Sequence, residues 1–289
     1  MDLYKDKLGN LAKVVSEIGT DLSPDGLALL GVCEIENRKV LEDFVKQELV
    51  ADREYQIVHF DSPDKRGIDV GLLYQPKYFE IDTSESLSIT DFIMDGGDTL
   101  FTRDILYVSG WLDGDLIHIY VNHWPSRSGG EKRSRPRRNY CANKVKKHMT
   151  KILEKDAEAK ILVMGDLNDD PLSPSVKKYL GGKGSKEDLG HSDMFNPMVS
   201  MYKKGNGTLA WRDTWNLFDQ MIFSPSWLNN EEGFSHYKTK IHKKRYLVQK
   251  IGRYKGYPFR TFDGDMYVGG YSDHYPVYTY LTKPVNPSP

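Results

Sequence analysis

The apolar runs of this sequence are short, and six places where they begin or end carry acidic, amide or imidazole side chains. A short apolar run bounded by turn residues is typical of a buried strand. Strands of one sheet end at a common edge, so polar residues at their ends can gather around one point. The residues concerned are Glu34, Asp69, His123, Asp166 with Asn168, Asp219, and Asp273 with His274. One such residue would mean little, because strand ends meet water, but six places together predict a site.

The same runs predict many strands and a few helices. Apolar residues at helical spacing indicate helices over 8–18, 37–49 and 138–154. Strands are expected at 28–36, 56–60, 68–74, 105–111, 116–122, 160–164, 217–223 and 277–281, with Asp113-Gly114 as a hairpin turn. Long loops are expected at 90–102, 181–206 and 231–265. Many strands with few helices favour an α/β fold in which two sheets pack face to face with helices outside.

Composition sets the class of protein. The 289 residues are 39% hydrophobic and 28% charged, which is typical of a globular chain and excludes an intrinsically disordered one. No uncharged apolar stretch approaches the roughly 20 residues of a membrane-spanning helix. The sequence has no Ser/Gly linker that would divide it, so we expect one domain over residues 1–282, followed by a Pro-rich disordered tail over 283–289. We expect a monomer.

Two basic segments interrupt an otherwise acidic chain. The net charge is −1, but residues 132–151 hold nine Lys and Arg without an acid, and residues 238–255 hold eight. They account for 17 of the 40 basic residues, whereas the other positions carry 23 basic and 41 acidic residues. With Arg127, the first segment spans 127–151, and we expect 127–138 to be a flexible loop. Basic segments favour phosphate-bearing partners such as nucleic acid, and a solvated surface is the alternative for each.

Three motifs occur in a fixed order along the chain: Gly31-Val32-Cys33-Glu34-Ile35-Glu36-Asn37, Gly165-Asp166-Leu167-Asn168 and Ser272-Asp273-His274. Together they resemble the signatures of the endonuclease/exonuclease/phosphatase superfamily, which has the deoxyribonuclease I-like fold. The resemblance covers about residues 27–281, and the stretch 207–220 is also similar to a bacterial subgroup. It implies a two-layer β-sandwich flanked by helices, arranged as four α/β/β/α layers.

The resemblance also implies a role for each motif residue. Glu34 resembles the main metal ligand and Asp273 a neighbouring carboxylate that helps to hold the ion. Asp166 and Asn168 would lie beside the scissile phosphate. His274 resembles an imidazole paired with the Asp219 carboxylate, and His123 a second imidazole paired with Asp69. The side chains that would bind the substrate phosphate are Arg66, Arg103 and Arg127.

One feature departs from the family pattern. Members usually begin with a strand that carries an asparagine near the phosphate, whereas this chain opens on a helix that includes Asn10. The resemblance therefore implies that the family's N-terminal strand is absent from this chain. Met1 leads directly into Asp2-Leu3-Tyr4-Lys5 without the apolar segment of a signal peptide, and the sequence assigns no compartment.

The residue types fit metal-assisted cleavage of a phosphate ester. Carboxylate and amide oxygens are hard ligands that suit Mg²⁺ or Mn²⁺, and such an ion neutralises charge on phosphoryl oxygens. An imidazole backed by a carboxylate can carry the proton of water or of the leaving group. No GxSxG motif is present, so direct attack by water is favoured over a covalent intermediate. We expect a nuclease; a phosphatase or phosphodiesterase acting on a small or lipid-borne phosphate, and a catalytically impaired binding protein, are the alternatives.

Overall fold

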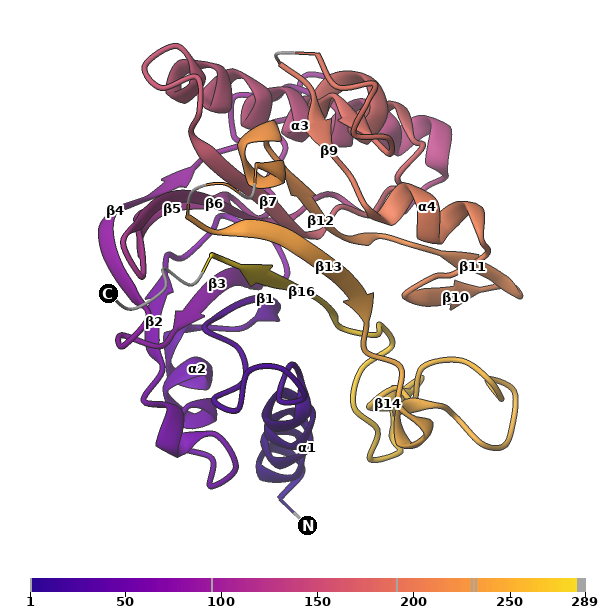
Figure 1. Cartoon of the computed structure of the whole chain (residues 1–289). Coiled ribbons are helices and arrows are strands. Elements are labelled where there is room, and N and C mark those ends of the chain that lie inside the picture. Colours follow the sequence, from indigo (N-terminus) through magenta and orange to yellow (C-terminus); the bar gives the residue numbers. More distant parts are fainter. Residues whose placement is uncertain (1, 95, 191, 230, 232, 285–289) are drawn as a thin grey trace.

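A seven-stranded mixed sheet forms the centre of the structure, a computed structural model that describes residues 2–94, 96–190, 192–229, 231 and 233–284 (Figure 1). Its strands follow the order β4-β5-β6-β7-β12-β9-β8. Their bounds are β4 Phe79–Leu87, β5 Ile105–Leu112, β6 Asp115–His123, β7 Lys160–Asp166, β12 Asp219–Phe223, β9 Met194–Phe195 and β8 Gly182–Lys183. Strands β6 and β7 run parallel, and β12 runs antiparallel to β7.

A second layer of strands packs against one face of this sheet. It consists of a three-stranded sheet, β1-β3-β2, and a two-stranded sheet, β13-β16. The bounds are β1 Leu29–Ile35, β2 Gln56–His59, β3 Asp69–Tyr74, β13 Ser235–Ile241 and β16 Val277–Thr282. Apolar side chains of both layers, such as Val70, Leu72, Val121 and Phe223, form one continuous core. The two-sheet sandwich predicted from the sequence is confirmed.

Helices cover both outer faces (Figure 1). Helix α3, Glu131–Leu153, packs Val145 and Met149 on the central sheet, against Tyr120 and Ile161. Helices α1, Leu3–Glu17, and α2, Arg38–Phe44, pack on the β1-β3-β2 sheet. The arrangement is the α/β/β/α sandwich. No helix in the described part of the chain is long and apolar enough to cross a membrane.

The remaining elements are short. Helix α4 spans Met198–Lys203, and a π-helical turn spans Ser175–Leu180. Two small hairpins are formed by β10 Leu209–Trp211 with β11 Thr214–Asn216 and by β14 Phe262–Asp263 with β15 Met266–Tyr267. The tail predicted at 283–289 lies outside the described residues from residue 285 onward.

The prediction of a flexible loop at 127–138 was wrong, because helix α3 begins at Glu131. The side chain of Arg138 is fully buried at the start of this helix. It donates hydrogen bonds to the Pro125 carbonyl and to Ser134 Oγ, and its Nε lies 2.8 Å from Asp169 Oδ1. Hydrophobic periodicity could not reveal this anchor, because the residue that fixes the helix is charged.

The basic segment 127–151 therefore contributes less free charge than its composition indicates. Many of its cations contact protein groups: Arg127 binds Asp169 and Asp170, Arg135 binds Glu131, Lys144 binds Asp91 and Lys146 binds the Ser192 carbonyl. These side chains join α3 to neighbouring segments.

The prediction of loops at 231–265 and 181–206 was also wrong in part. Strand β13 pairs with β16 along its whole length, and β8, β9 and α4 lie within the second range. Strand β4 was not predicted at all. Both β4 and β13 consist largely of polar or charged residues, such as Lys238 and Lys240, so they carry no apolar run.

We predict that Arg138→Ala lowers the free energy of unfolding by about 3–5 kcal/mol, because it leaves the buried Asp169 carboxylate without this partner. Urea unfolding followed by circular dichroism measures the change. The neighbouring Arg137, for which the structure shows no ion pair among the described residues, is the matched control. Arg137→Ala is expected to change stability by about 0.5 kcal/mol or less. Equal effects of both substitutions would contradict the anchoring role.

Candidate active site

Strand register brings three of the predicted residues into one row. His123 at the end of β6 pairs with Asp166 at the end of β7, and Asp166 pairs with Asp219 at the start of β12. Gly165 makes this close approach possible. It has a φ of 125°, and a Cβ there would lie 2.0 Å from the Asn122 carbonyl oxygen. The row therefore depends on a glycine directly before Asp166.

His274 and Asp219 form a hydrogen-bonded pair, as predicted. His274 Nδ1 lies 2.8 Å from Asp219 Oδ2, and the ligand atoms of Asp166, Asp219 and His274 all lie within 4.8 Å of one another. Burial lowers the pKa of His274, but the Asp219 carboxylate, with Asp166 and Asp273, outweighs burial and raises the pKa to about 10. The imidazole is therefore protonated at neutral pH in the metal-free protein, and Asp219 orients it.

Asp166 and Asn168 are held together at the end of β7. Asp166 Oδ1 accepts a hydrogen bond from the Asn168 amide at 2.8 Å, and Asn168 Nδ2 donates to the Trp124 carbonyl at 2.9 Å. Asn168 adopts a left-handed conformation with φ 50°. Burial raises the pKa of Asp166 to about 7, with Asp219 adding to the rise and His274 opposing it. This carboxyl can therefore exchange a proton near neutral pH.

His123 lies on the other side of Asp166, with Nε2 3.5 Å from Asp166 Oδ2. Burial, with the nearby Arg103 and Arg66 cations, holds its pKa well below the usual range. Its Nδ1 is buried without a hydrogen-bond partner among the described residues. His123 is therefore a neutral imidazole at pH 7.

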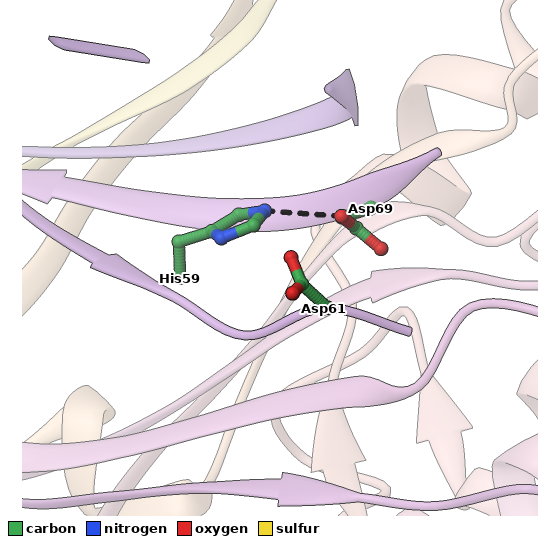
Figure 2. A group of neighbouring side chains, drawn as sticks. All are labelled: His59, Asp61 and Asp69. Carbon is green, nitrogen blue, oxygen red and sulfur yellow. Dashed lines mark hydrogen bonds and ion pairs between the residues drawn. The ribbon is translucent and has the colours of Figure 1, made fainter. Parts of the chain in front are cut away.

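The predicted pairing of His123 with Asp69 was wrong. Asp69 instead contacts His59, with His59 Nε2 3.1 Å from Asp69 Oδ2, and accepts a hydrogen bond from the Ser62 amide (Figure 2). Figure 2 shows Asp61 beside this pair, and the ligand atoms of the three side chains lie within 4.8 Å of one another. Strand register brings His59 close to Asp69, because His59 on β2 pairs with Gly71 on β3, two residues beyond Asp69. The pair fixes the base of the loop that carries Asp64 and Arg66.

Glu34 lies at a bulge near the end of β1. The register with β3 shifts between Cys33 and Ile35, and Glu34 has a φ of 60°. Its side chain is 60% exposed, and one carboxylate oxygen lies 3.7 Å from Arg66 Nη2. Glu34 and Asp273 line the same cleft, so the two predicted metal ligands face a common space.

The three predicted phosphate-binding arginines have different surroundings. Arg66 is 59% exposed beside Glu34. Arg103 is buried: it forms an ion pair with Asp64 at 3.0 Å and donates hydrogen bonds to the carbonyls of His123 and Trp124. Its contacts therefore give it a structural role, fixing the end of β6.

Arg127 is also engaged with the protein. It binds the Asn168 carbonyl and both Asp169 and Asp170, and its guanidinium lies 4.4 Å from the Phe218 ring centre. Arg127 therefore fixes the loop after β7. Of the three arginines, only Arg66 has a largely exposed side chain.

Several residues near the site were missed by the sequence reasoning. Lys7 and Arg260 line the cleft of Glu34 and Asp273, and Asp64 joins Arg66 to Arg103. Lys7 precedes Leu11 by four residues and Val14 by seven, so it borders the apolar face of the first helix, and nothing else in the sequence marked it. For Asp64 and Arg260 no pattern in the sequence distinguishes them from other surface charges.

The family of the chain follows from comparison with known proteins. The sequence profile described as the Endonuclease/Exonuclease/phosphatase family matches residues 1–283. The chain belongs to this family. No curated protein matches it significantly.

Solved structures share the fold of this family member. One is an endonuclease/exonuclease/phosphatase family protein from Bacteroides thetaiotaomicron, with 15% identity and a TM-score of 0.63 over 96% of this chain and 89% of that chain. The mannosyl-6-phosphatase of B. thetaiotaomicron has 14% identity and a TM-score of 0.60 over 96% and 91% of the two chains. D. rerio TDP2, complexed with single strand DNA product, has 14% identity and a TM-score of 0.56 over 95% and 93%. At these identities the similarity establishes the deoxyribonuclease I-like fold alone.

We predict that His274 stays protonated to above pH 9 in EDTA-treated protein, because its pKa is raised from 6.5 to about 10. The raised pKa stabilises the folded state fully below pH 6.5, and this contribution is lost as pH rises through about 10. Asp219→Asn is expected to lower the pKa of His274, whereas Asp263→Asn on the exposed β14–β15 hairpin leaves it unchanged. Imidazole NMR titration measures all three proteins. A wild-type pKa near the ordinary value would show that Asp219 does not hold the proton.

Proposed function

We propose that this protein is a divalent-metal-dependent phosphoesterase that hydrolyses phosphodiester bonds of nucleic acid by direct attack of water. The preference for nucleic acid rests on one observation. Near His274, the partly exposed Trp215 ring carries the exposed Lys243, and aromatic rings with cations bind nucleic acid by stacking on bases and neutralising phosphates.

Tyr275, which directly follows His274, is buried and supports the Trp215 ring. The Trp215 ring stacks on Tyr275 with 6.0 Å between centres, and Lys243 Nζ lies 4.6 Å from the Trp215 ring centre. The basic segment 238–255 continues from there through the exposed Lys250, Arg253 and Lys255. We infer that a phosphate chain bound at the catalytic residues extends over these cations.

The residues of the cleft fit a divalent cation. Glu34 and Asp273 offer carboxylate oxygens, the hard donors that Mg²⁺ and Mn²⁺ prefer, and Glu34 keeps a left-handed backbone that directs its largely exposed side chain into the cleft. Non-glycine residues in such conformations cluster at functional sites. A bound ion would neutralise charge that develops on the phosphoryl oxygens.

The other side chains position the phosphate and carry protons. The His274 imidazolium, oriented by Asp219, donates a hydrogen bond to a phosphoryl or leaving-group oxygen. Asp166 accepts a proton from the attacking water, since its pKa of about 7 suits a general base. Asn168 orients the water or a non-bridging oxygen. Burial raises the pKa of Cys33, so its thiol stays protonated and is a poor nucleophile.

We expect His274→Ala to lower turnover by about 10²–10⁴-fold, the usual contribution of one acid–base group. Glu34→Gln is expected to abolish the response to Mg²⁺ or Mn²⁺. Glu36→Gln is the matched control, because Glu36 is an exposed glutamate two residues further along the chain. Rates are measured on plasmid DNA, single-stranded DNA, RNA, bis-p-nitrophenyl phosphate and p-nitrophenyl phosphate, with metal or with EDTA. Full metal-dependent activity in Glu34→Gln or in His274→Ala would refute these roles.

A second experiment tests nucleic acid against small substrates. Lys250, Arg253 and Lys255 are changed together to glutamine, and the control changes Lys147, Lys151 and Lys155, exposed lysines near the far end of α3. If three phosphate contacts are lost, the slope of log K against log salt should become less steep by about 2–3 for polynucleotide binding. Hydrolysis of bis-p-nitrophenyl phosphate should not change, and the control should keep the wild-type slope.

The alternatives give different results in these experiments. A phosphatase or phosphodiesterase for a small or lipid-borne phosphate would cleave the small substrates faster than any polynucleotide, and neither triple variant would change its salt dependence. A catalytically impaired binding protein would bind nucleic acid with the predicted salt slope and cleave none of the substrates with either metal. Either outcome would overturn the proposed nuclease activity.

A further inference from the structure

A cleft of about 480 Å³ lies between α1 and the segment that leads to Asp273. Glu34 and Asp273 form part of its lining, and the reaction described above uses both. The remaining lining includes two cations, Lys7 and Arg260, and the ring of Phe262, which no step of that reaction uses.

Lys7 places a poorly neutralised ammonium group in this cleft. Its Nζ donates hydrogen bonds to Thr261 Oγ1 at 2.6 Å and to the Tyr271 carbonyl, both of which are neutral oxygens. Within the described ranges, no carboxylate lies within ion-pair distance of it. Burial lowers the pKa of Lys7 to about 8, while Asp273 and Glu34 act against this. A partly buried cation without a paired anion favours an anionic ligand.

Arg260 adds a second cation with unused donors. Its guanidinium lies 4.3 Å from the Tyr254 ring centre, and its Nε is buried without a hydrogen-bond partner in the part of the chain that the structure describes. A guanidinium that stacks on a ring keeps its N–H groups in a fixed plane, which matches the oxygens of a phosphate group.

The Phe262 ring is 47% exposed and is supported by a neighbouring ring. It packs edge-on against Tyr267 with 5.4 Å between ring centres. Tyr267 in turn hydrogen-bonds Asp6 of α1, and Asn10 donates to the Gly269 carbonyl. The β14–β15 hairpin is thus tied to α1, so the exposed ring is a fixed platform of the kind on which bases stack.

We propose that this cleft binds the nucleotide adjoining the scissile phosphate, with the neighbouring phosphate on Lys7 and Arg260 and the base on Phe262. The inference rests on the proposed function, because it places the scissile phosphate at Glu34 and Asp273. A second nucleotide unit would supply both a phosphate for the two cations and a base for the Phe262 ring, beside the metal ligands.

The test compares the binding of thymidine 3′,5′-bisphosphate and thymidine 5′-phosphate by calorimetry with Mg²⁺. All proteins carry His274→Ala so that the ligands stay intact, which ³¹P NMR verifies. The bisphosphate is expected to bind about ten- to a hundredfold more tightly, the effect of one or two charge-assisted hydrogen bonds. Lys7→Gln and Arg260→Gln should each reduce this ratio by about tenfold. Lys5→Gln, on an exposed turn of α1, should leave the ratio unchanged.

The same assay also tests whether the base stacks on Phe262. Phe262→Ala is expected to weaken binding of the bisphosphate by about five- to a hundredfold, the range for one stacked base. Met266→Ala, at an exposed position of the same hairpin, is the control and should have no effect.

Equal affinity of the parent protein for the two ligands would overturn the proposal, as would a ratio that neither Lys7→Gln nor Arg260→Gln changes. If Lys7 only supports the fold, its substitution weakens both ligands equally. Arg260→Gln keeps the test valid if Lys7→Gln misfolds, because the structure shows no side-chain hydrogen bond or ion pair from Arg260 among the described residues. Binding is measured without turnover, so if the wild-type enzyme cleaves phosphodiesters but the affinity ratio is not found, only this inference is refuted. An enzyme that cleaves no phosphodiester refutes the proposed function instead.

Discussion

The register of β6, β7 and β12 is the constraint on which the candidate site depends. Asp166 pairs with His123 on one neighbouring strand and with Asp219 on the other, so backbone hydrogen bonds set the spacing of the three side chains. His274 then joins the row through Asp219. Because a slip of one residue would turn every side chain of a strand to the opposite face, the packed core on both sides of the sheet also preserves the site.

Buried charges hold the loops that surround this row. Arg103 binds the carbonyls of His123 and Trp124 at the end of β6, and Arg138 and Arg127 share Asp169 in the loop after β7. Each arginine satisfies several backbone or carboxylate oxygens, and the side chains of Arg103 and Arg138 are buried. Breaking one such network is costly, since it leaves a buried charge or carbonyl without a partner. The basic residues near residue 130 therefore stabilise the fold, in addition to any contact with a ligand.

Much of the fold and part of the candidate site could be predicted from the sequence. Buried strands such as β7 contain an apolar run, here residues 161–164, and the motif residues at their ends follow the order of a known family. The pairing of His274 with Asp219 came from that order. The partner of Asp69 could not be found in this way, because it depends on the register of β2 with β3. Strand β13 and the first turns of α3 were also missed, since polar residues that pair or bury their charges leave no apolar pattern.

The left-handed backbone of Glu34 has a consequence for how this protein balances stability against activity. A non-glycine residue with a φ of 60° carries conformational strain, which the surrounding sheet must compensate. Glycine would adopt the same backbone without that strain, but it would remove the carboxylate from the cleft. Selection for stability alone would therefore favour a change at the very position on which the proposed chemistry depends. With glutamate at this position, the fold forgoes part of the stability that glycine would allow and keeps a carboxylate in the cleft.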